Sequence, residues 1–174
     1  NDGKMPETIN SPYNNGGFTF DAVNNIGYFT QCNGFDGKGK TCKIYSSVYN
    51  PKANTWAPPE ALSFSSDDYN VAQPAISANG KTIYYSSDKP DGFGGKDIYR
   101  SVRGGGNSWS DPLNLGKNIN TSGDEVFPFI AGDSLIYFSS DGHPGVGSLD
   151  IFKAQIQANN KFGKPENLGL PYNS

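Results

Sequence analysis

The acidic, glycine-rich segment from Asp88 to Asp97 contains residue types that could bind a metal ion. Asp88, Asp91 and Asp97 place three carboxylates within ten residues, and three glycines lie between them. Calcium takes roughly six to eight oxygen ligands, and such a loop can turn carboxylates and carbonyls toward one point. The alternative is that the aspartates accept hydrogen bonds from turn amides. A related segment further along keeps only Asp141 and Asp150, which favours the structural interpretation over a calcium site.

Residue types suited to catalysis are sparse. His143 is the only histidine, so a Ser-His-Asp triad would need it as the base. No G-x-S-x-G nucleophile motif is present. Thirteen Asp and four Glu allow the carboxylate pair of a glycosidase without indicating one. We therefore expect no enzymatic activity and no cofactor, with calcium as the minority hypothesis. The alternative is a carbohydrate-binding or glycan-hydrolysing protein, in which Trp56, Trp109 and Phe162 could stack on sugars.

The two cysteines, Cys32 and Cys42, flank a glycine-rich loop. If this loop joins two paired strands, the cysteines face each other at the roughly 4.5–5.5 Å Cα separation of such strands, which suits a disulfide. The alternative is two reduced thiols in the cytosol, since two cysteines cannot complete a structural zinc site. We favour the disulfide, which indicates an exported protein in an oxidising compartment.

The composition indicates an all-β protein and excludes several classes of partner. Gly and Pro contribute 22 and 12 residues and aromatic side chains 13% of the chain, as in proteins built from many short strands and tight turns. The net charge is −3 and no long basic run occurs, so a nucleic-acid-binding surface is not expected. No long apolar stretch predicts membrane insertion.

These residues belong to a repeat of 53 residues. The segment 82–100, TIYYSSDKPDGFGGKDIYR, returns at 135–153 as LIYFSSDGHPGVGSLDIFK. Trp56, Trp109 and Phe162 follow at the same spacing, each at the start of an outer segment. Fixed-period self-similarity is the signature of a repeat architecture. We expect each of these aromatic residues to pack its outer strand against its own unit.

Each unit contains four short extended segments, the number in one β-propeller blade. The chain is therefore predicted to be a partial propeller of three four-stranded blades whose apolar residues fill the gaps between blades. In the first unit, the segment from Ile26 to Gln31 is a diverged copy of the segment from Ile83 to Asp88. Pro74 and Pro128 are expected at the starts of the inner strands, where a missing N–H is tolerated. The predicted units are 1–16 (the end of a preceding blade), 17–70, 71–125 and 126–174.

The second and third repeats resemble a known family. The pattern SANGKTIYYSSD…GGKDIYR is similar to the WD-type repeat of TolB-like β-propellers, in the version found in OmpA-associated envelope lipoproteins of bacteria. The resemblance covers almost the whole chain and is weakest in the first repeat. It implies a non-enzymatic protein-interaction scaffold in the periplasm or at the outer membrane, with a protein partner in the cell envelope.

The resemblance also raises the question of ring closure. Such propellers usually have six or more blades, so this chain is expected to be a fragment of a longer polypeptide, or else a half-ring completed by a second copy. Partner contacts are expected at exposed loop tips, because aromatic anchors dominate interface energetics. The candidates are Phe35, Phe93 and His143.

Overall fold

The computed structural model describes residues 9–10, 15–32, 40–105, 108–157 and 161–173. In this part of the chain there are thirteen β-strands and no helix that is long and apolar enough to cross a membrane. The all-β prediction is confirmed. The strands are β1 (Asn15–Asp21), β2 (Ile26–Cys32), β3 (Cys42–Asn50), β4 (Thr55–Trp56), β5 (Glu60–Ala61), β6 (Val71–Ile76), β7 (Thr82–Ser87), β8 (Asp97–Val102), β9 (Leu113–Asn114), β10 (Glu125–Ala131), β11 (Leu135–Ser140), β12 (Asp150–Gln155) and β13 (Glu166–Asn167).

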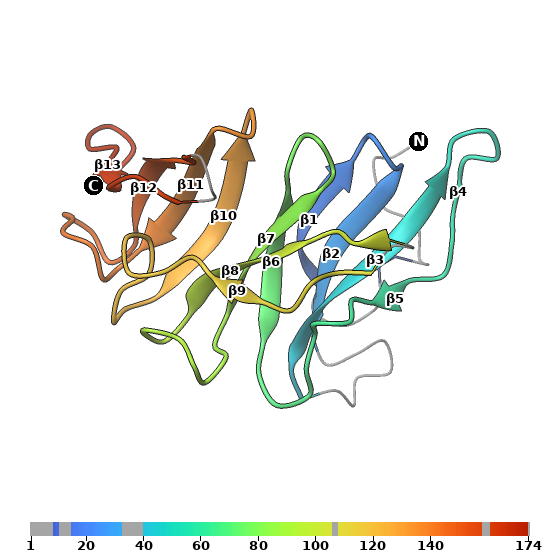
Figure 1. Cartoon of the computed structure of the whole chain (residues 1–174), viewed down its shortest axis with the longest axis horizontal. Coiled ribbons are helices and arrows are strands. Elements are labelled where there is room, and N and C mark those ends of the chain that lie inside the picture. Colours follow the sequence, from blue (N-terminus) through green and yellow to red (C-terminus); the bar gives the residue numbers. More distant parts are fainter. Residues whose placement is uncertain (1–8, 11–14, 33–39, 106–107, 158–160, 174) are drawn as a thin grey trace.

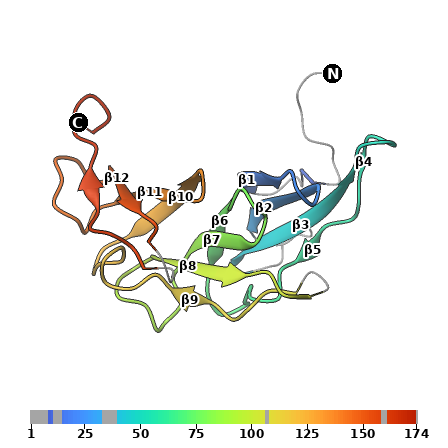
Figure 2. The same cartoon turned by 45° about the horizontal axis from the view of Figure 1, so that its top comes forward.

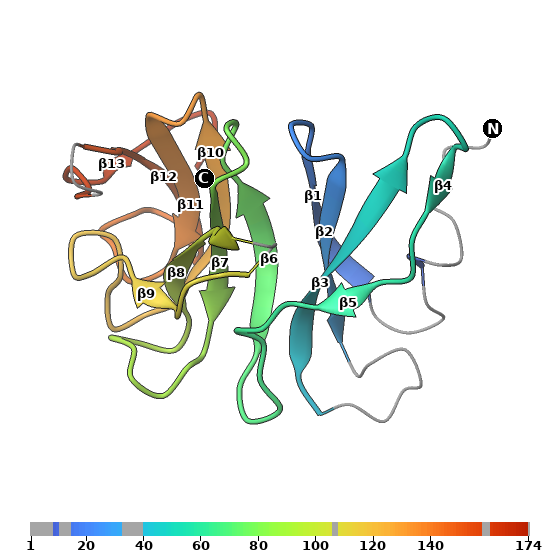
Figure 3. The same cartoon turned by 45° about the vertical axis from the view of Figure 1, so that its right-hand side comes forward.

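The strands form three antiparallel sheets, one for each repeat. The first sheet has the order β1-β2-β3-β4 with β5 also paired to β3, the second β6-β7-β8-β9, and the third β10-β11-β12-β13. Figures 1 and 3 show the second sheet between the other two. The three sheets form an open array and not a closed ring (Figure 2). The predicted partial propeller of three blades is confirmed, with one extra short strand in the first blade.

The register of the first blade differs from an end-to-end alignment of Ile26–Gln31 with Ile83–Asp88. Phe29 pairs with Tyr45 in the first sheet, as Tyr85 pairs with Tyr99 in the second. Phe29 is therefore the counterpart of Tyr85, and the match of Ile26 to Ile83 is wrong by one residue. Successive strand residues point to opposite faces, so this single step moves every side chain to the other face.

The inner strands begin before their prolines. Pro74 lies inside β6, at an irregularity between Ala72 and Ala75, and Pro128 lies at the same place in β10. The residues before them, Gln73 and Phe127, have φ values of 57° and 53°. The expectation of a proline at the strand start was wrong, because a bulge inside the strand absorbs the missing N–H equally well.

The apolar residues lie mainly between sheets, as predicted. We call the face of a sheet toward the preceding sheet its front face and the opposite face its back face. Burial of each large apolar side chain contributes roughly 1.5–3 kcal/mol to folding. The first junction joins the back of the first sheet (Ile26, Tyr28, Ile44) to the front of the second (Ile83, Tyr85, Tyr99). The second junction joins the back of the second sheet (Ala75, Tyr84, Ile98) to the front of the third (Ile136, Phe138, Phe152).

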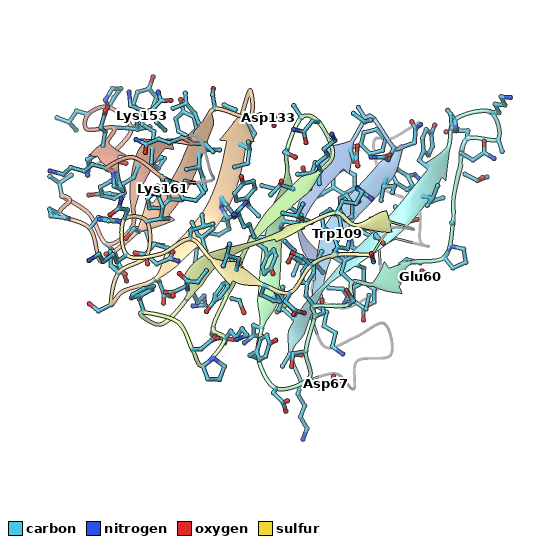
Figure 4. The ribbon with its side chains drawn as sticks, in the orientation of Figure 1. Glu60, Asp67, Trp109, Asp133, Lys153 and Lys161 are labelled. Carbon is cyan, nitrogen blue, oxygen red and sulfur yellow. A yellow bond between two sulfur atoms is a disulfide. The ribbon has the colours of Figure 1, made fainter. Side chains whose placement is uncertain are left out.

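The three periodic aromatic residues pack at these front faces. Trp56 pairs with Tyr49 on the first sheet, as expected from the repeat. Trp109, labelled in Figure 4, forms an isolated bridge with Arg103. Its ring lies edge-on to that of Tyr28 of the preceding sheet, with 5.9 Å between the ring centroids. Phe162 is buried in the second junction. They fasten outer segments to their own blades and, in the second and third blades, also seal the contact with the preceding blade.

Candidate interaction face formed by the hairpin loops

The loop between β7 and β8 is held by the carboxylate of Asp97, the first residue of β8. Its Oδ2 accepts the amide of Phe93 at 2.5 Å, and its Oδ1 accepts the amide of Gly94 at 3.2 Å. The side-chain amide of Asn114 donates to the same carboxylate at 2.7 Å. Aspartate commonly stabilises turns in this way. The carboxylate thus fixes the backbone of the loop tip.

The loop between β11 and β12 is built in the same way. Asp150 accepts the amide of Val146 at 2.5 Å and that of Gly147 at 3.1 Å. Asn167 donates to this carboxylate at 3.3 Å. The predicted role of Asp97 and Asp150 as structural residues at the start of the next strand is confirmed.

These two clamps display an apolar residue at the same position of each loop. Phe93 lies four residues before Asp97 and is 53% exposed, and Val146 lies four residues before Asp150 and is 74% exposed. Phe93 was a sequence candidate for partner contact, whereas Val146 was missed. The signal that could have found Val146 is its fixed distance from the recurring aspartate.

The loop of Phe93 is also fastened to the connection between the second and third sheets. The amide of Gly95 donates to the carbonyl of Gly123 at 2.9 Å. A Cβ at Gly94 would lie 2.2 Å from that carbonyl oxygen, so only glycine allows this approach. Lys96 pairs with Asp124 at 2.7 Å. Phe93 is therefore presented on a preorganised loop, which lowers the entropy cost of binding.

The three predicted calcium ligands turn to different partners. Asp88 accepts both the backbone and side-chain amides of Asn70, each at 2.6 Å. Asp91 forms an ion pair with Lys89 and accepts a hydrogen bond from Tyr99, and the Lys89 hydrogen bond lowers the pKa of its carboxyl group. Asp97 holds the loop amides. Among the described residues, no group of three His, Cys, Asp or Glu side chains is placed to hold a metal ion. The calcium site stays a prediction.

His143 belongs to the second junction as well as to its loop. Its ring packs on Phe152 and Phe138, at centroid distances of 5.1 and 5.8 Å. Its Nε2 lies 2.8 Å from the carbonyl oxygen of Ile119. Contact between His143 and a partner stays a prediction. Phe35, the remaining candidate, lies outside the described residues.

The first blade closes its hairpin covalently. Cys32 and Cys42 are paired across β2 and β3 and form the predicted disulfide, with a Cα–Cα distance of 3.9 Å. A groove of about 430 Å³ runs beside this disulfide and is lined from the second and third blades by Gln73, Lys96 and Phe127, among others. The hairpin ends and this groove together form the candidate interaction face.

Comparison with known proteins identifies the fold. No protein-family model matches the chain, and no curated protein matches it in sequence. The chain is similar in structure to a putative TolB from Agrobacterium tumefaciens, with a TM-score of 0.57 and 17% identity over 92% of this chain and 50% of the other. It is also similar to TolB from Acinetobacter baumannii, with a TM-score of 0.53 and 12% identity over 90% of this chain and 33% of the other. The three blades have the fold of part of a TolB-like β-propeller. The chain spans half the length of the first neighbour and a third of the second.

Proposed function

We propose that this chain is a non-enzymatic protein-binding module of an exported, TolB-like propeller, located in the periplasm or at the outer membrane. Its partner is an envelope protein that docks on the hairpin-loop face, where Phe93 and Val146 act as apolar anchors. The observation that carries the proposal is the repeated aspartate clamp, which holds each of these exposed side chains on a fixed loop.

The chemistry of this face supports binding in preference to catalysis. The carboxylates of Asp97 and Asp150 are engaged by loop amides, and the Nε2 of His143 lies at hydrogen-bonding distance from a backbone carbonyl. Groups held in this way serve positioning, whereas catalysis needs an acid, base or nucleophile directed at a substrate. Exposed apolar side chains on a rigid frame are the usual anchors of protein interfaces.

Two observations support the proposed location. The Cys32–Cys42 disulfide supports an oxidising compartment. The structural neighbours are named as TolB proteins. A glycan-binding function is less well supported, because Trp109 and Phe162 pack at the junctions between blades and Trp56 packs on Tyr49 and Phe18.

The test measures partner binding with loop-tip variants. Proteins retained from a cell-envelope extract by the immobilised chain are identified by mass spectrometry, and the dissociation constant of the most enriched one is measured. We expect Phe93→Ser and Val146→Ser each to weaken this binding about tenfold or more, as loss of an interface anchor does. Val102→Ser is the matched control, because Val102 is an exposed apolar residue at the end of β8 opposite to the loop of Phe93.

A second variant distinguishes the role of the loop that positions Phe93 from the direct contact of Phe93 with the partner. Asp97→Asn keeps Phe93 but weakens the carboxylate clamp, so we expect a smaller loss of affinity than for Phe93→Ser. Equal affinity for the wild type and all loop variants would refute this interaction face. Turnover of an oligosaccharide by the purified chain would refute the non-enzymatic assignment.

A further inference from the structure

A hollow of about 320 Å³ lies at the first junction, beside the outer strand β5. Its size is near the lower end of the range of ligand sites. The first blade lines it with Ser46, Val48, Glu60 and Leu62, and the second blade with Arg103 and Trp109. We call it the junction hollow. Val48 belongs to the end of the β2–β3 pair opposite to the disulfide, so the junction hollow is separate from the hairpin-loop face.

The second and third blades carry a long basic side chain at one equivalent position. Arg100 of β8 pairs with Leu113 of β9, and Lys153 of β12 pairs with Glu166 of β13. Residues directly opposite each other on paired strands can interact on one face of the sheet, and Lys153 forms an ion pair with Glu166 at 3.3 Å. Arg100 lies opposite a leucine, and within the described part of the chain its buried Nη1 has no hydrogen-bond partner. The third blade thus has both the base and its acid, whereas the second has the base alone.

The first blade has the acid without the base. Ser46 pairs with Glu60 of β5. It also pairs with Tyr28, just as Arg100 pairs with the equivalent Tyr84. Serine does not fill the space that a longer side chain would take, and no ion-pair partner of Glu60 occurs among the described residues. The junction hollow is therefore the place of a basic side chain that position 46 lacks.

The charge of Arg103 is already balanced within the chain. Its guanidinium donates to the buried carboxylate of Asp21 at 2.7 Å and to the carbonyl of Gly80 at 2.8 Å. It also lies over the ring of Trp109, 4.7 Å from the centroid. Because Arg103 and Asp21 neutralise each other, the carboxylate of Glu60 gives the junction hollow a net negative charge. An anion is therefore not the complement of this site, whereas a cation is.

We propose that the junction hollow binds a long basic side chain, arginine or lysine, presented by a partner protein. The aliphatic stem would lie against Val48 and Leu62, and the charged end would lie beside Glu60, as Lys153 lies beside Glu166 in the third blade. The ring of Trp109 in the same wall is an aromatic group of the kind that attracts cations.

The occupant is a residue of a protein because the site needs more than one charge contact. An ion pair at the surface contributes little on its own, so the apolar stem and the surface around it must add to the affinity. Val48 is 49% exposed, and a polypeptide that carries the basic side chain can cover it. This site is independent of the hairpin-loop face, so the two proposals can fail separately.

The test titrates the purified chain with capped peptides, Gly-Arg-Gly, Gly-Lys-Gly, Gly-Leu-Gly and Gly-Glu-Gly. The indole N–H resonance of Trp109 is followed by NMR, and Trp56→Phe assigns it because the chain has two tryptophans. We expect the two basic peptides to shift this resonance saturably, with dissociation constants about fivefold or more below those of the other two. The proposal would be overturned if the leucine or glutamate peptide bound as tightly, or if no peptide shifted the resonance at tens of millimolar.

A pair of matched variants tests the charge. Glu60→Gln removes the acid of the junction hollow and is expected to weaken binding of Gly-Arg-Gly about three- to fivefold. Glu60 is exposed, so the variant is expected to fold. Glu166→Gln is the control, because it removes the equivalent acid of the third blade, which already pairs with Lys153. Equal dissociation constants for the two variants would contradict the site.

A third variant tests the space. Ser46→Arg places within the first blade the side chain that Arg100 supplies in the second, and it is expected to abolish the peptide-induced shift of Trp109. Circular dichroism verifies that this variant folds, and Glu60→Gln tests the site independently of it. A folded Ser46→Arg variant that binds Gly-Arg-Gly as the wild type does would refute binding in the junction hollow.

Discussion

The two junctions between blades share one geometry but use different chemistry. At the first junction, Arg103 donates to Asp21 at 2.7 Å and to the Tyr28 hydroxyl at 2.5 Å. Its guanidinium also lies 5.9 Å from the centroid of the Tyr28 ring and 4.7 Å from that of Trp109. A hollow of about 320 Å³ remains beside these groups, lined in part by Ser46. The first junction therefore depends on one hydrogen-bonded arginine that lies beside two aromatic rings.

The second junction has apolar packing where the first has the contacts of Arg103. Ile156 and Phe162 form the bridge that Arg103 and Trp109 form at the first junction. Arg100 pairs with Tyr84 in the second sheet. The equivalent residue of the first sheet is Ser46, which pairs with Tyr28. Arg100 is buried, and within the described part of the chain its Nη1 has no hydrogen-bond partner.

The difference shows that the repeat specifies the stacking of the sheets, while a few side chains decide the energetics of each junction. A buried ion pair is costly to break but contributes little relative to apolar packing. A buried donor without a partner carries a desolvation penalty of about 1–3 kcal/mol. One arginine is therefore expected to hold its junction together, and the other to weaken it.

The largest expected effect tests this contrast directly. Arg103→Met leaves the buried Asp21 carboxylate without its guanidinium partner, so we expect the free energy of unfolding to fall by about 3–5 kcal/mol. Arg100→Met removes a donor that lacks a partner, so we expect a change within about 1 kcal/mol or a gain in stability. Urea unfolding of both variants gives the comparison. Equal destabilisation would contradict the contrast between the junctions.

The next effect concerns the hairpins. The first blade closes its hairpin with a disulfide, and the other two use Asp97 and Asp150. Changing Cys32 and Cys42 together to serine frees a short loop in the unfolded chain, so we expect a loss of about 2–3 kcal/mol in the free energy of unfolding. Dithiothreitol should lower the thermal midpoint of the wild type and leave that of the double serine variant unchanged. A reductant effect on the variant would point to another cause.

High pH is expected to weaken the first junction more than the second. Burial raises the pKa of Tyr85, and it raises that of Tyr99 to about 12, whereas the unfolded value is about 10. The folded chain thus retains protons that the unfolded chain loses, so stability is complete below about pH 10 and falls toward about pH 12. At the second junction, the counterparts Phe138 and Phe152 do not titrate. Burial raises the pKa of Tyr84 there, so a smaller alkaline effect is expected at that junction.

The control variant gives the first junction the phenylalanine residues that the second junction has at the same positions. Changing Tyr85 and Tyr99 together to phenylalanine should reduce the fall in the free energy of unfolding between about pH 10 and 12. Denaturant titrations at several pH values give the measurement. An unchanged alkaline profile in this variant would show that other groups govern it.

The smallest expected effect concerns calcium. The aspartates of the second and third loops share structural roles. In the second loop, which has more carboxylates, Asp88, Asp91 and Asp97 each have a hydrogen-bond or ion-pair partner. We expect EDTA and added calcium to leave the thermal midpoint unchanged. A rise with calcium that Asp91→Asn removes would establish a site in the second loop.

Much of the fold could be predicted because the repeat appears in the sequence three times. The repeated segments 82–100 and 135–153, identified from the sequence, each contain the two strands and the loop of a central hairpin, β7 and β8 in the second blade and β11 and β12 in the third. The disulfide was predicted because it spans a single hairpin. The register of the first blade was not, since Gly27 replaces the isoleucine of the other two repeats while Ile26 lies one residue earlier, so a match of similar letters slips by one residue.

The candidate site was predicted in part. Phe93 was identified from the exposed character of its loop, whereas Val146 was missed because a valine carries no signal of its own. The hydrogen bonds to Asp97 and Asp150 show that Phe93 and Val146 occupy equivalent positions in their loops. The partial burial of His143 was not expected, because its contact with Phe152 depends on how the loop folds back on the sheet.

The sequence by itself determined the 53-residue period, the all-β class, the strand order within each blade and the disulfide. These are local properties, set by alternation, turn residues and spacing along the chain. The tertiary structure alone decided which face of each sheet meets its neighbour, which arginine has a partner, and which aromatic residues stay exposed. The physical reason is that side chains alternate between the two faces of a strand, so burial depends on how one sheet stacks on the next.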